Sequence, residues 1–415
     1  MFQTARGTKD TMQEEMIRLQ YVISVIKSVY EKYGFDPLDT PVFEEWGLLS
    51  AKQGGGEEIK QEIYYFKDKS DRELGLRFDL TVPLARVFIN NPQLPLPFKR
   101  SHVAKVWRYD KPGAMRFREF WQADVDIIGS ESMEAEAECL KAVCEIFYEL
   151  GFSDFIIRLN NRKTIEAFVK SIGINDYTDI FRSVDKLDKI GEEGVEKELR
   201  GRGISEDKIK KILQFIKIKS LNEAKKYVSE GLDETEQILA SLSEYKKNVK
   251  FDVSLVRGLE YYTGPVFEVS LAAGVSVAGG GRFDNLTEAI GGKKIPATGI
   301  SIGVDRVVSI MEERNMFANL EKTYTKIFVV SVNDAVKKDV IEIVQKLRKF
   351  EVPSEFDLMN RSLSKQLDYV NSKGIPFAIV IGDKELKAKK AKLRDMKTGE
   401  EKDIDLGKLE EIRQL

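Results

Sequence analysis

Near the start of the chain, apolar positions recur with helical spacing. Residues 17–29 carry this period, the preceding sequence Thr11-Met-Gln-Glu14 has the form of a capping box, and Gly34 follows. A capping box favours the start of a helix, and a glycine commonly ends one. The pattern therefore predicts one long helix with a buried face, followed by an extended segment at residues 35–43.

Further along the chain, apolar and polar residues alternate with a period of two in place of the helical period. Residues 104–110 and 116–128 predict two strands joined by the turn Lys111-Pro-Gly-Ala-Met115. Residues 76–81 predict a shorter strand, and a helix is expected to begin near Pro83.

The strand at residues 116–128 has two different faces, because alternate side chains of an extended chain share a face. Its odd positions are apolar apart from Glu119. Its even positions are mostly polar: Arg118, Phe120, Gln122, Asp124 and Asp126. On spacing alone, a half-exposed sheet is the simpler interpretation. The alternative is a ligand site, since guanidinium groups bind phosphates and an aromatic ring can stack on a base.

The pattern predicts an α+β chain with an interrupted first domain. Residues 1–162 and 248–320 mix strands with helices, and residues 163–247 have a charged, helix-period sequence that predicts an inserted helical domain. In residues 326–415 strands alternate with helices, which predicts a compact α/β domain.

Composition excludes several classes of protein. The 415 residues are 42% hydrophobic and 32% charged with a net charge of −2, which is typical of a globular protein. No apolar run reaches the roughly 20 residues that a bilayer requires, and the N-terminus lacks the apolar core of a signal peptide. His102 is the single histidine, and Cys139 and Cys144 are the only cysteines. We therefore expect no membrane span, no dedicated metal cage and a reducing, cytoplasmic location.

Five segments together resemble a known family. Residues 106–112, 116–122 and 126 resemble the second signature motif of class II aminoacyl-tRNA synthetases, in the form of the histidine enzymes. Val256-Arg-Gly-Leu-Glu-Tyr-Tyr-Thr-Gly264 and Gly279-Gly-Gly-Arg-Phe-Asp284 resemble two motifs specific to those enzymes. Residues 299–306 resemble the third class II motif, and residues 34–41 resemble the first. The resemblance covers nearly the whole chain.

The resemblance implies a catalytic arrangement for ATP. Arg108 would hold the α-phosphate and Arg116 the γ-phosphate, while Phe120 and Arg306 would enclose the adenine. Asp110 replaces the glutamate that many class II enzymes place beside the adenine. Arg257 would stabilise the charge that builds up as the histidine carboxylate attacks the α-phosphate.

The resemblance also implies a pocket for histidine. The residues expected to bind its ammonium group are Asp79, Thr81 and Gln122. Asp126 and Tyr262 would contact the two imidazole nitrogens, with Tyr261 lining the pocket. Bacterial histidine enzymes have glutamate at the positions of Asp79 and Asp126. The shorter aspartate side chains of this sequence resemble the archaeal and eukaryotic branch of the family. Taken singly, these residues have plainer interpretations: arginines in surface ion pairs, core tyrosines, glycines in a turn at 279–281, and Thr81 as a helix cap.

The family implies an antiparallel catalytic sheet flanked by helices, with a C-terminal anticodon-binding domain. It implies ATP with Mg²⁺, L-histidine and its tRNA as partners, and a homodimer formed through the first motif. The turn 111–115 and the helical insertion would face the acceptor arm of the tRNA. A basic run at residues 384–394 could follow phosphates or could be a solvated hairpin. The competing function is a non-catalytic, synthetase-like regulatory subunit of ATP phosphoribosyltransferase, but that family lacks the C-terminal domain.

Overall fold

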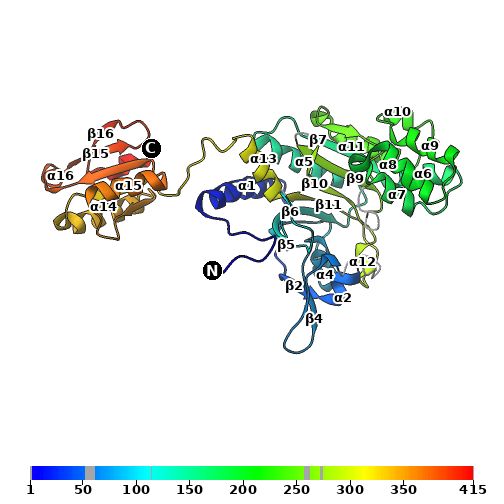
Figure 1. Ribbon diagram of the computed structural model, residues 1–415, viewed down its shortest axis with the longest axis horizontal. Coiled ribbons are helices and arrows are strands. Elements are labelled where there is room, and N and C mark those ends of the chain that lie inside the picture. The colour runs from blue at the N-terminus through cyan, green and yellow to red at the C-terminus, as the bar shows by residue number, and fades with distance from the viewer. Residues whose placement is uncertain (1, 52–60, 114, 257–261, 272–273, 415) are drawn as a thin grey trace. The chain divides into compact units, whose positions relative to one another are not determined.

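The computed structural model describes residues 2–51, 61–113, 115–256, 262–271 and 274–414. The chain divides into two compact units, one of residues 1–10 and 19–316 and the other of residues 11–18 and 317–415. Helices and strands occur in both units (Figure 1), so the α+β prediction is confirmed.

The larger unit is built on a wide sheet. Among the described residues it has eight strands, in the order β1 (Asp36–Pro37), β5 (Phe98–Trp107), β6 (Glu119–Ile128), β11 (Ala297–Gly303), β10 (Val275–Arg282), β9 (Pro265–Leu271), β7 (Ile156–Asn161) and β8 (Val249–Phe251). The six inner strands are antiparallel, as predicted. The short edge strands β1 and β8 pair in parallel with their neighbours, so the complete sheet is mixed. A parallel pair needs a long connection, and the helices between β7 and β8 provide one.

Helices α1 (Gln13–Lys32), α5 (Glu134–Glu149) and α13 (Val304–Glu313) accompany this sheet, and α5 and α13 lie beside it (Figure 1). The predicted N-terminal helix is confirmed. Tyr30 of α1 donates a hydrogen bond to the carbonyl oxygen of Ala123 in β6, at 3.0 Å. Gly34 has a φ of +67°, and the amide of Phe35 bonds to the carbonyl of Tyr30, so the glycine ends the helix in a left-handed turn.

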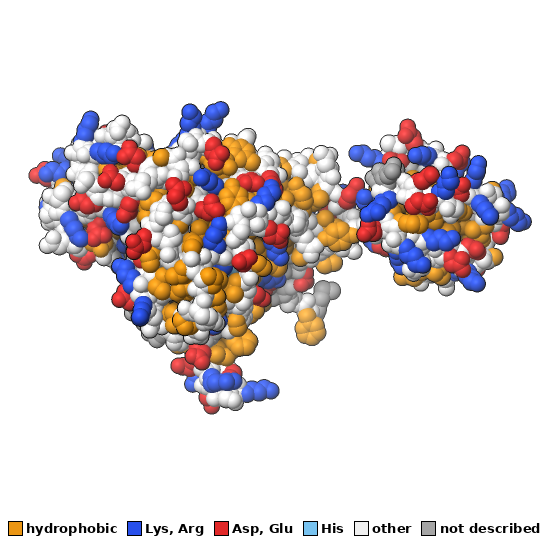
Figure 2. Space-filling model, turned by 180° about the vertical axis from the view of Figure 1, so that it is seen from behind, with side chains coloured by type: hydrophobic (Ala, Val, Ile, Leu, Met, Phe, Trp, Pro, Cys, Tyr) orange, Lys and Arg blue, Asp and Glu red, His pale blue; other side chains and the backbone are white. Residues whose placement is uncertain are grey.

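A second, three-stranded sheet has the order β2 (Phe43–Glu45), β4 (Glu73–Leu76) and β3 (Tyr65–Lys67), beside α2 (Trp46–Ala51). Phe43, Tyr65 and Phe66 are exposed on it. Figure 2 shows apolar side chains gathered next to the charged tip of the β3–β4 hairpin.

The predicted strand at residues 76–81 is wrong. Strand β4 ends at Leu76, and α4 (Thr81–Asn90) begins five residues later. Asp79 Oδ1 accepts a hydrogen bond from the amide of Val82 at 3.0 Å. A short carboxylate that bonds to a nearby amide favours a turn or a helix start over a strand. The Asp79 side chain therefore satisfies one amide of the first turn of α4, while Leu80 occupies the N-cap position.

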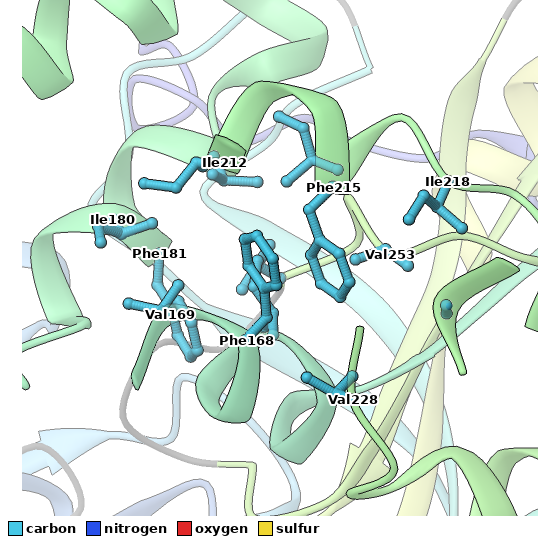
Figure 3. Packing of buried hydrophobic residues seen from close by; sticks show 14 of the residues in the cluster. Phe168, Val169, Ile180, Phe181, Ile212, Phe215, Ile218, Val228 and Val253 are labelled. Carbon is cyan, nitrogen blue, oxygen red and sulfur yellow. The ribbon is translucent and has the colours of Figure 1, made fainter. Parts of the chain in front are cut away.

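The chain between β7 and β8 is helical and has its own core. Its helices are α6 (Arg162–Ser171), α7 (Thr178–Val184), α8 (Leu187–Gly201), α9 (Glu206–Ile216), α10 (Leu221–Ala224) and α11 (Leu232–Ser241), with a 3₁₀ turn at Ser243–Tyr245. The rings of Phe168 and Phe215 stack at 3.8 Å in the middle of this core (Figure 3). Phe251 and Val253 also pack into it, so the helices are joined to the sheet by a shared apolar cluster.

The smaller unit is a compact α/β domain, as predicted. Its sheet has the order β13 (Ser354–Phe356), β12 (Ile327–Ser331), β14 (Phe377–Ile381), β15 (Lys390–Asp395) and β16 (Glu401–Asp405). Its helices are α14 (Lys337–Lys349), α15 (Leu363–Lys373) and α16 (Asp383–Ala388), with 3₁₀ turns at Asp334–Val336 and Leu409–Gln414. Apolar clusters cover both faces of β12 and β14. No helix in the described parts of the chain is both long and apolar enough to cross a membrane.

The single histidine gives a direct test of this fold. His102 on β5 is 2% exposed, and its Nε2 lies 3.0 Å from Asp39 Oδ1. Burial, followed by the positive charge of Arg100, lowers the pKa of His102 to about 4. We expect its NMR signals to titrate near pH 4.

This shift has a consequence for stability. As the pH falls from about 6.5 through 4, the unfolded chain takes up a proton that the folded chain refuses, so stability is lost over that window. A His102→Gln variant should lack this component. A midpoint at or above pH 6.5 for His102 in the folded protein would contradict the burial of the ring.

Candidate functional site

A cavity of about 870 Å³ lies over the large sheet of the first unit. It is lined by nine of the twelve residues that the sequence singled out: Asp79, Thr81, Arg108, Asp110, Arg116, Phe120, Gln122, Tyr262 and Arg306. They come from segments more than 200 positions apart, so the fold brings the candidate residues together.

The register of the inner strands explains the floor of the cavity. Gln122 of β6 is paired with Gly303 of β11, and Asp124 is paired with Ser301. Paired residues on neighbouring antiparallel strands point to the same face. Gln122 is 8% exposed and Asp124 is 2% exposed. The interpretation of this strand as a half-exposed sheet is therefore wrong, and its polar face forms the floor of the cavity.

Arg108 has a fixed orientation at one side of the cavity. Its Nε donates to the carbonyl oxygen of Phe78 at 2.9 Å, and its Nη2 lies 3.5 Å from Oε1 of Gln122. The guanidinium carbon lies 5.3 Å from the centre of the Phe120 ring. A guanidinium group held in this way presents its remaining N–H groups in one direction, which suits an anionic ligand.

Two further arginines border the cavity. Arg116 is more than half exposed and forms an ion pair with Asp110, at 2.9 Å between Nη2 and Oδ2. Arg306, at the start of α13, donates from Nη1 to the carbonyl oxygen of Ser276 at 2.9 Å. The cavity therefore combines several guanidinium groups with an aromatic ring, an arrangement that suits a nucleotide.

The part of the cavity that is lined by the Asp79 carboxylate lies at the start of α4. Asp79 is 9% exposed and lines the cavity together with Thr81. The Asp79 carboxylate accepts the amide of Val82, so the same residue fixes the first turn of α4 and lines the cavity.

Glycines in two of the recognised segments make room for candidate side chains. A Cβ atom on Gly299 would lie 2.0 Å from Oδ1 of Asp126, and one on Gly281 would lie 2.9 Å from Cδ1 of Tyr262. Gly279, Gly280 and Gly281 belong to strand β10, so the interpretation of these glycines as a turn is wrong. Glycine in a strand often marks such a close approach.

One described candidate residue, Asp126, is not on the lining. Asp126 is buried and forms an ion pair with Arg100, at 2.5 Å between Oδ2 and Nη2. Arg257 and Tyr261 lie outside the described residues. The role of Asp126 in contacting the imidazole ring stays a prediction.

Several lining residues were not singled out from the sequence. Asp124, Ser301 and Glu268 lie on three different strands at positions that the register brings into one row. The alternation of β6 placed Asp124 on the polar face, but its partner Ser301 could be identified only once the pairing of β6 with β11 was known.

Arg282, which follows Gly281 in the same segment, is buried in a structural ion pair. Its Nε and Nη2 donate to the two carboxylate oxygens of Glu136 in α5, at 2.7 and 2.8 Å, and its Nη1 donates to the carbonyl oxygen of Ser130. Arg282 is 4% exposed and Glu136 is fully buried. This pair ties β10 to the helix behind the sheet.

Comparisons with known proteins point to one family. A family model described as histidyl-tRNA synthetase matches residues 7–307, and one described as an anticodon binding domain matches residues 326–414. A histidine–tRNA ligase of Nanoarchaeum equitans is 39% identical, with 99% of this chain and 98% of that protein covered. The corresponding enzymes of Thermococcus kodakarensis and Clostridium tetani are 36% and 39% identical, each over 96% of this chain and 95% of the relative.

Solved structures give the same family. The histidyl-tRNA synthetase of Nostoc is 30% identical with a TM-score of 0.87, covering 100% of this chain and 99% of that one. A Bacillus halodurans protein described as an ATP phosphoribosyltransferase regulatory subunit/histidyl-tRNA synthetase has a TM-score of 0.77 at 20% identity, over 90% of this chain and 96% of that one. Because its sequence identity is low, the second protein shows only that the fold is shared.

Proposed function

Since the chain belongs to the histidyl-tRNA synthetase family, we propose that it is a histidine–tRNA ligase, which activates histidine with ATP and transfers it to tRNA. The observation that carries this proposal is the cavity, which combines Arg108, Phe120 and Arg306 with Asp79, Gln122 and Tyr262. The first three groups suit a nucleotide, and the other three suit an amino acid with a polar ring.

For ATP, we propose that Arg108 holds the α-phosphate, supported by its two fixed contacts. Arg116 would move from its exposed pair with Asp110 to the γ-phosphate, and Phe120 and Arg306 would enclose the adenine. Asp110 would then contact the adenine through water. Arg257 would stabilise the negative charge at the α-phosphate during attack by the histidine carboxylate.

For histidine, we propose that Asp79, Thr81 and Gln122 bind the ammonium group. Tyr262 and Asp126 would contact the imidazole nitrogens, with Tyr261 beside them. A buried site that must satisfy both ring nitrogens discriminates strongly against amino acids that lack them. We therefore expect selectivity for histidine without an editing step.

Mg²⁺ would act with ATP by supplying positive charge to the phosphates. In the described ranges, no group of three or more His, Cys, Asp and Glu side chains is placed to hold a metal ion. We therefore propose that the ion is held mainly by phosphate oxygens, as is usual for Mg²⁺ with nucleotides.

For tRNA, we propose a division of labour along the chain. The C-terminal domain would bind the anticodon, and the helical insertion at 163–247 with the turn at 111–115 would face the acceptor arm. Lys390, Lys392 and Arg394 lie on or beside the β15–β16 hairpin, where Lys392 pairs with Glu401 at 3.1 Å. That pairing leaves both interpretations of the basic run open.

We also propose a cytoplasmic homodimer. The exposed side chains of Phe43, Tyr65 and Phe66 on the small sheet, with Val42 just before β2, form an apolar surface that follows the first-motif segment around Pro41. An exposed apolar patch of this kind favours a protein interface.

The regulatory-subunit alternative has weaker support. This chain matches the anticodon-binding model over residues 326–414 and has Arg108 and Arg306 in the cavity. The two functions differ in what they do to tRNA. A ligase attaches histidine to tRNA, whereas a regulatory subunit does not.

The test is transfer of labelled histidine to tRNA. Purified protein with ATP and Mg²⁺ should charge a histidine tRNA transcript and leave a phenylalanine tRNA transcript uncharged. Oxidation of the terminal ribose of the tRNA should abolish the signal. Absence of charging by folded protein, together with stimulation of an ATP phosphoribosyltransferase, would favour the regulatory function instead.

A further inference from the structure

We propose that Asp124 is a further specificity-determining residue, whose Oδ1 oxygen contacts the imidazole ring of histidine. The inference rests on the proposed function and extends it to a residue that the resemblance did not assign.

Asp124 has one carboxylate oxygen in use and one without a partner. It lies in the middle of β6, lines the cavity and is 2% exposed. The hydroxyl of Ser301 is hydrogen-bonded to its carboxylate, whereas Oδ1 has no hydrogen-bond partner among the described residues. A buried polar atom without a partner is costly and uncommon, and in a ligand cavity it marks a position for a ligand group.

The spacing between Gln122 and Asp124 matches the length of a histidine side chain. Alternate residues of a strand are about 6.6 Å apart on one face. Asp124 is therefore one such step from Gln122, which is proposed to bind the ammonium group, and this step is comparable with the length of a histidine side chain. Asp126 is a second step away, and its carboxylate is held by Arg100.

A chain of hydrogen bonds connects the two ends of the site. Arg108 contacts the side-chain oxygen of Gln122, and the side-chain nitrogen of Gln122 donates to the hydroxyl of Ser301. The Ser301 hydroxyl in turn bonds to the Asp124 carboxylate. The same network therefore orients the proposed phosphate-binding arginine and the proposed ring-binding carboxylate, which gives both a defined position before histidine arrives.

The charges around Asp124 favour a ring that can donate or carry a proton. The pKa of Asp124 is raised to about 7, chiefly by burial and in part by the negative charges of Asp126 and Asp79, against the opposite effects of Arg100 and Ser301. On the other packed elements, Tyr30 of α1 has its own pKa raised, and His102 opposite on β5 has a lowered pKa and stays neutral. Since free imidazole titrates near pH 6.5, Asp124 and the ring would share one proton around neutral pH.

The test compares histidine with triazolylalanine, which has a ring of the same shape but far lower basicity. We would measure kcat/KM for both amino acids in pyrophosphate exchange with wild type and with Asp124→Asn. The preference for histidine should fall by about ten- to a hundredfold in the variant, through the KM for histidine, because a hydrogen bond to a charged group is lost. The KM for ATP should stay within about twofold.

The pH profile separates this role from a structural one. The preference for histidine should depend on pH between about 6 and 8 in wild type and should flatten in Asp124→Asn. Ser301→Ala keeps the carboxylate and should shift the preference less, in the same direction. This second variant also tests the proposal if Asp124→Asn does not fold, as judged by circular dichroism.

Asp126→Asn is the matched comparison, because it makes the same change one step along the same face. An active wild type, with a preference unchanged in Asp124→Asn and Ser301→Ala but reduced in Asp126→Asn, would overturn the role of Asp124 and leave the proposed function standing. A folded wild type that exchanges with no amino acid would instead remove the proposed function, and the role of Asp124 with it.

Discussion

Replacing Arg108 by alanine should lower kcat/KM for histidine-dependent pyrophosphate exchange by about 10²- to 10³-fold, the range seen when one preorganised donor to a developing charge is removed. The guanidinium group is fixed by Phe78 and Gln122 and lies beside Phe120, so little reorganisation is needed when the α-phosphate arrives. Arg108→Lys keeps the charge but loses the planar, two-point geometry, and it should recover only part of the activity.

The control for Arg108 is an arginine with no place in the cavity. Arg200 on α8 is exposed and pairs with Glu196 and Glu206 on the surface, where ion pairs contribute little to stability. Arg200→Ala should exchange pyrophosphate at the wild-type rate. Equal activity of Arg108→Ala and Arg200→Ala would contradict the assignment of Arg108 to the phosphate.

Replacing Arg282 by alanine should destabilise the unit that holds the cavity by about 3–5 kcal/mol, because the carboxylate of Glu136 is left buried without its partner. Urea unfolding followed by circular dichroism measures this loss. Activity at low temperature should survive in the fraction that remains folded, since Arg282 does not line the cavity.

Replacing both partners tests whether the loss of stability comes from the unpaired charge or from a change in packing. Glu136→Leu combined with Arg282→Met removes both charges and keeps similar volume, so the double variant should recover much of the stability that Arg282→Ala loses. The single variants Glu136→Leu and Arg282→Met give the comparison. If the double variant loses as much free energy of unfolding as the two single variants added together, the ion pair is not the cause of the loss.

The sequence predicted best the elements with a strong period. The N-terminal helix predicted from residues 17–29 is present as α1, because its apolar positions follow a clear helical period between a capping sequence and Gly34. Strand β11 was not expected as a strand, and β10 extends through its three glycines. A Cβ atom on Gly280 would lie 2.1 Å from the carbonyl oxygen of Gly299, so packing between strands, rather than local preference, selects glycine there.

The candidate site was predicted in its residue types but not in its internal contacts. The alternation of β6 placed Gln122, Asp124 and Asp126 on one face, and the structure brings Gln122 and Asp124 of that face to the cavity floor. Alternation cannot show which strand lies opposite. The pairing of Asp124 with Ser301, and of Asp126 with Arg100, depends on contacts between positions far apart in the chain. Those pairings determine which carboxylate oxygen is left for a ligand.

The most direct test of the proposed function is pyrophosphate exchange into ATP with each of the twenty amino acids supplied in turn. A histidine–tRNA ligase should support exchange with histidine alone, and Arg257→Ala should abolish this exchange without unfolding the protein. Folded protein that binds histidine but supports exchange with no amino acid would contradict the proposed function and would favour the regulatory function.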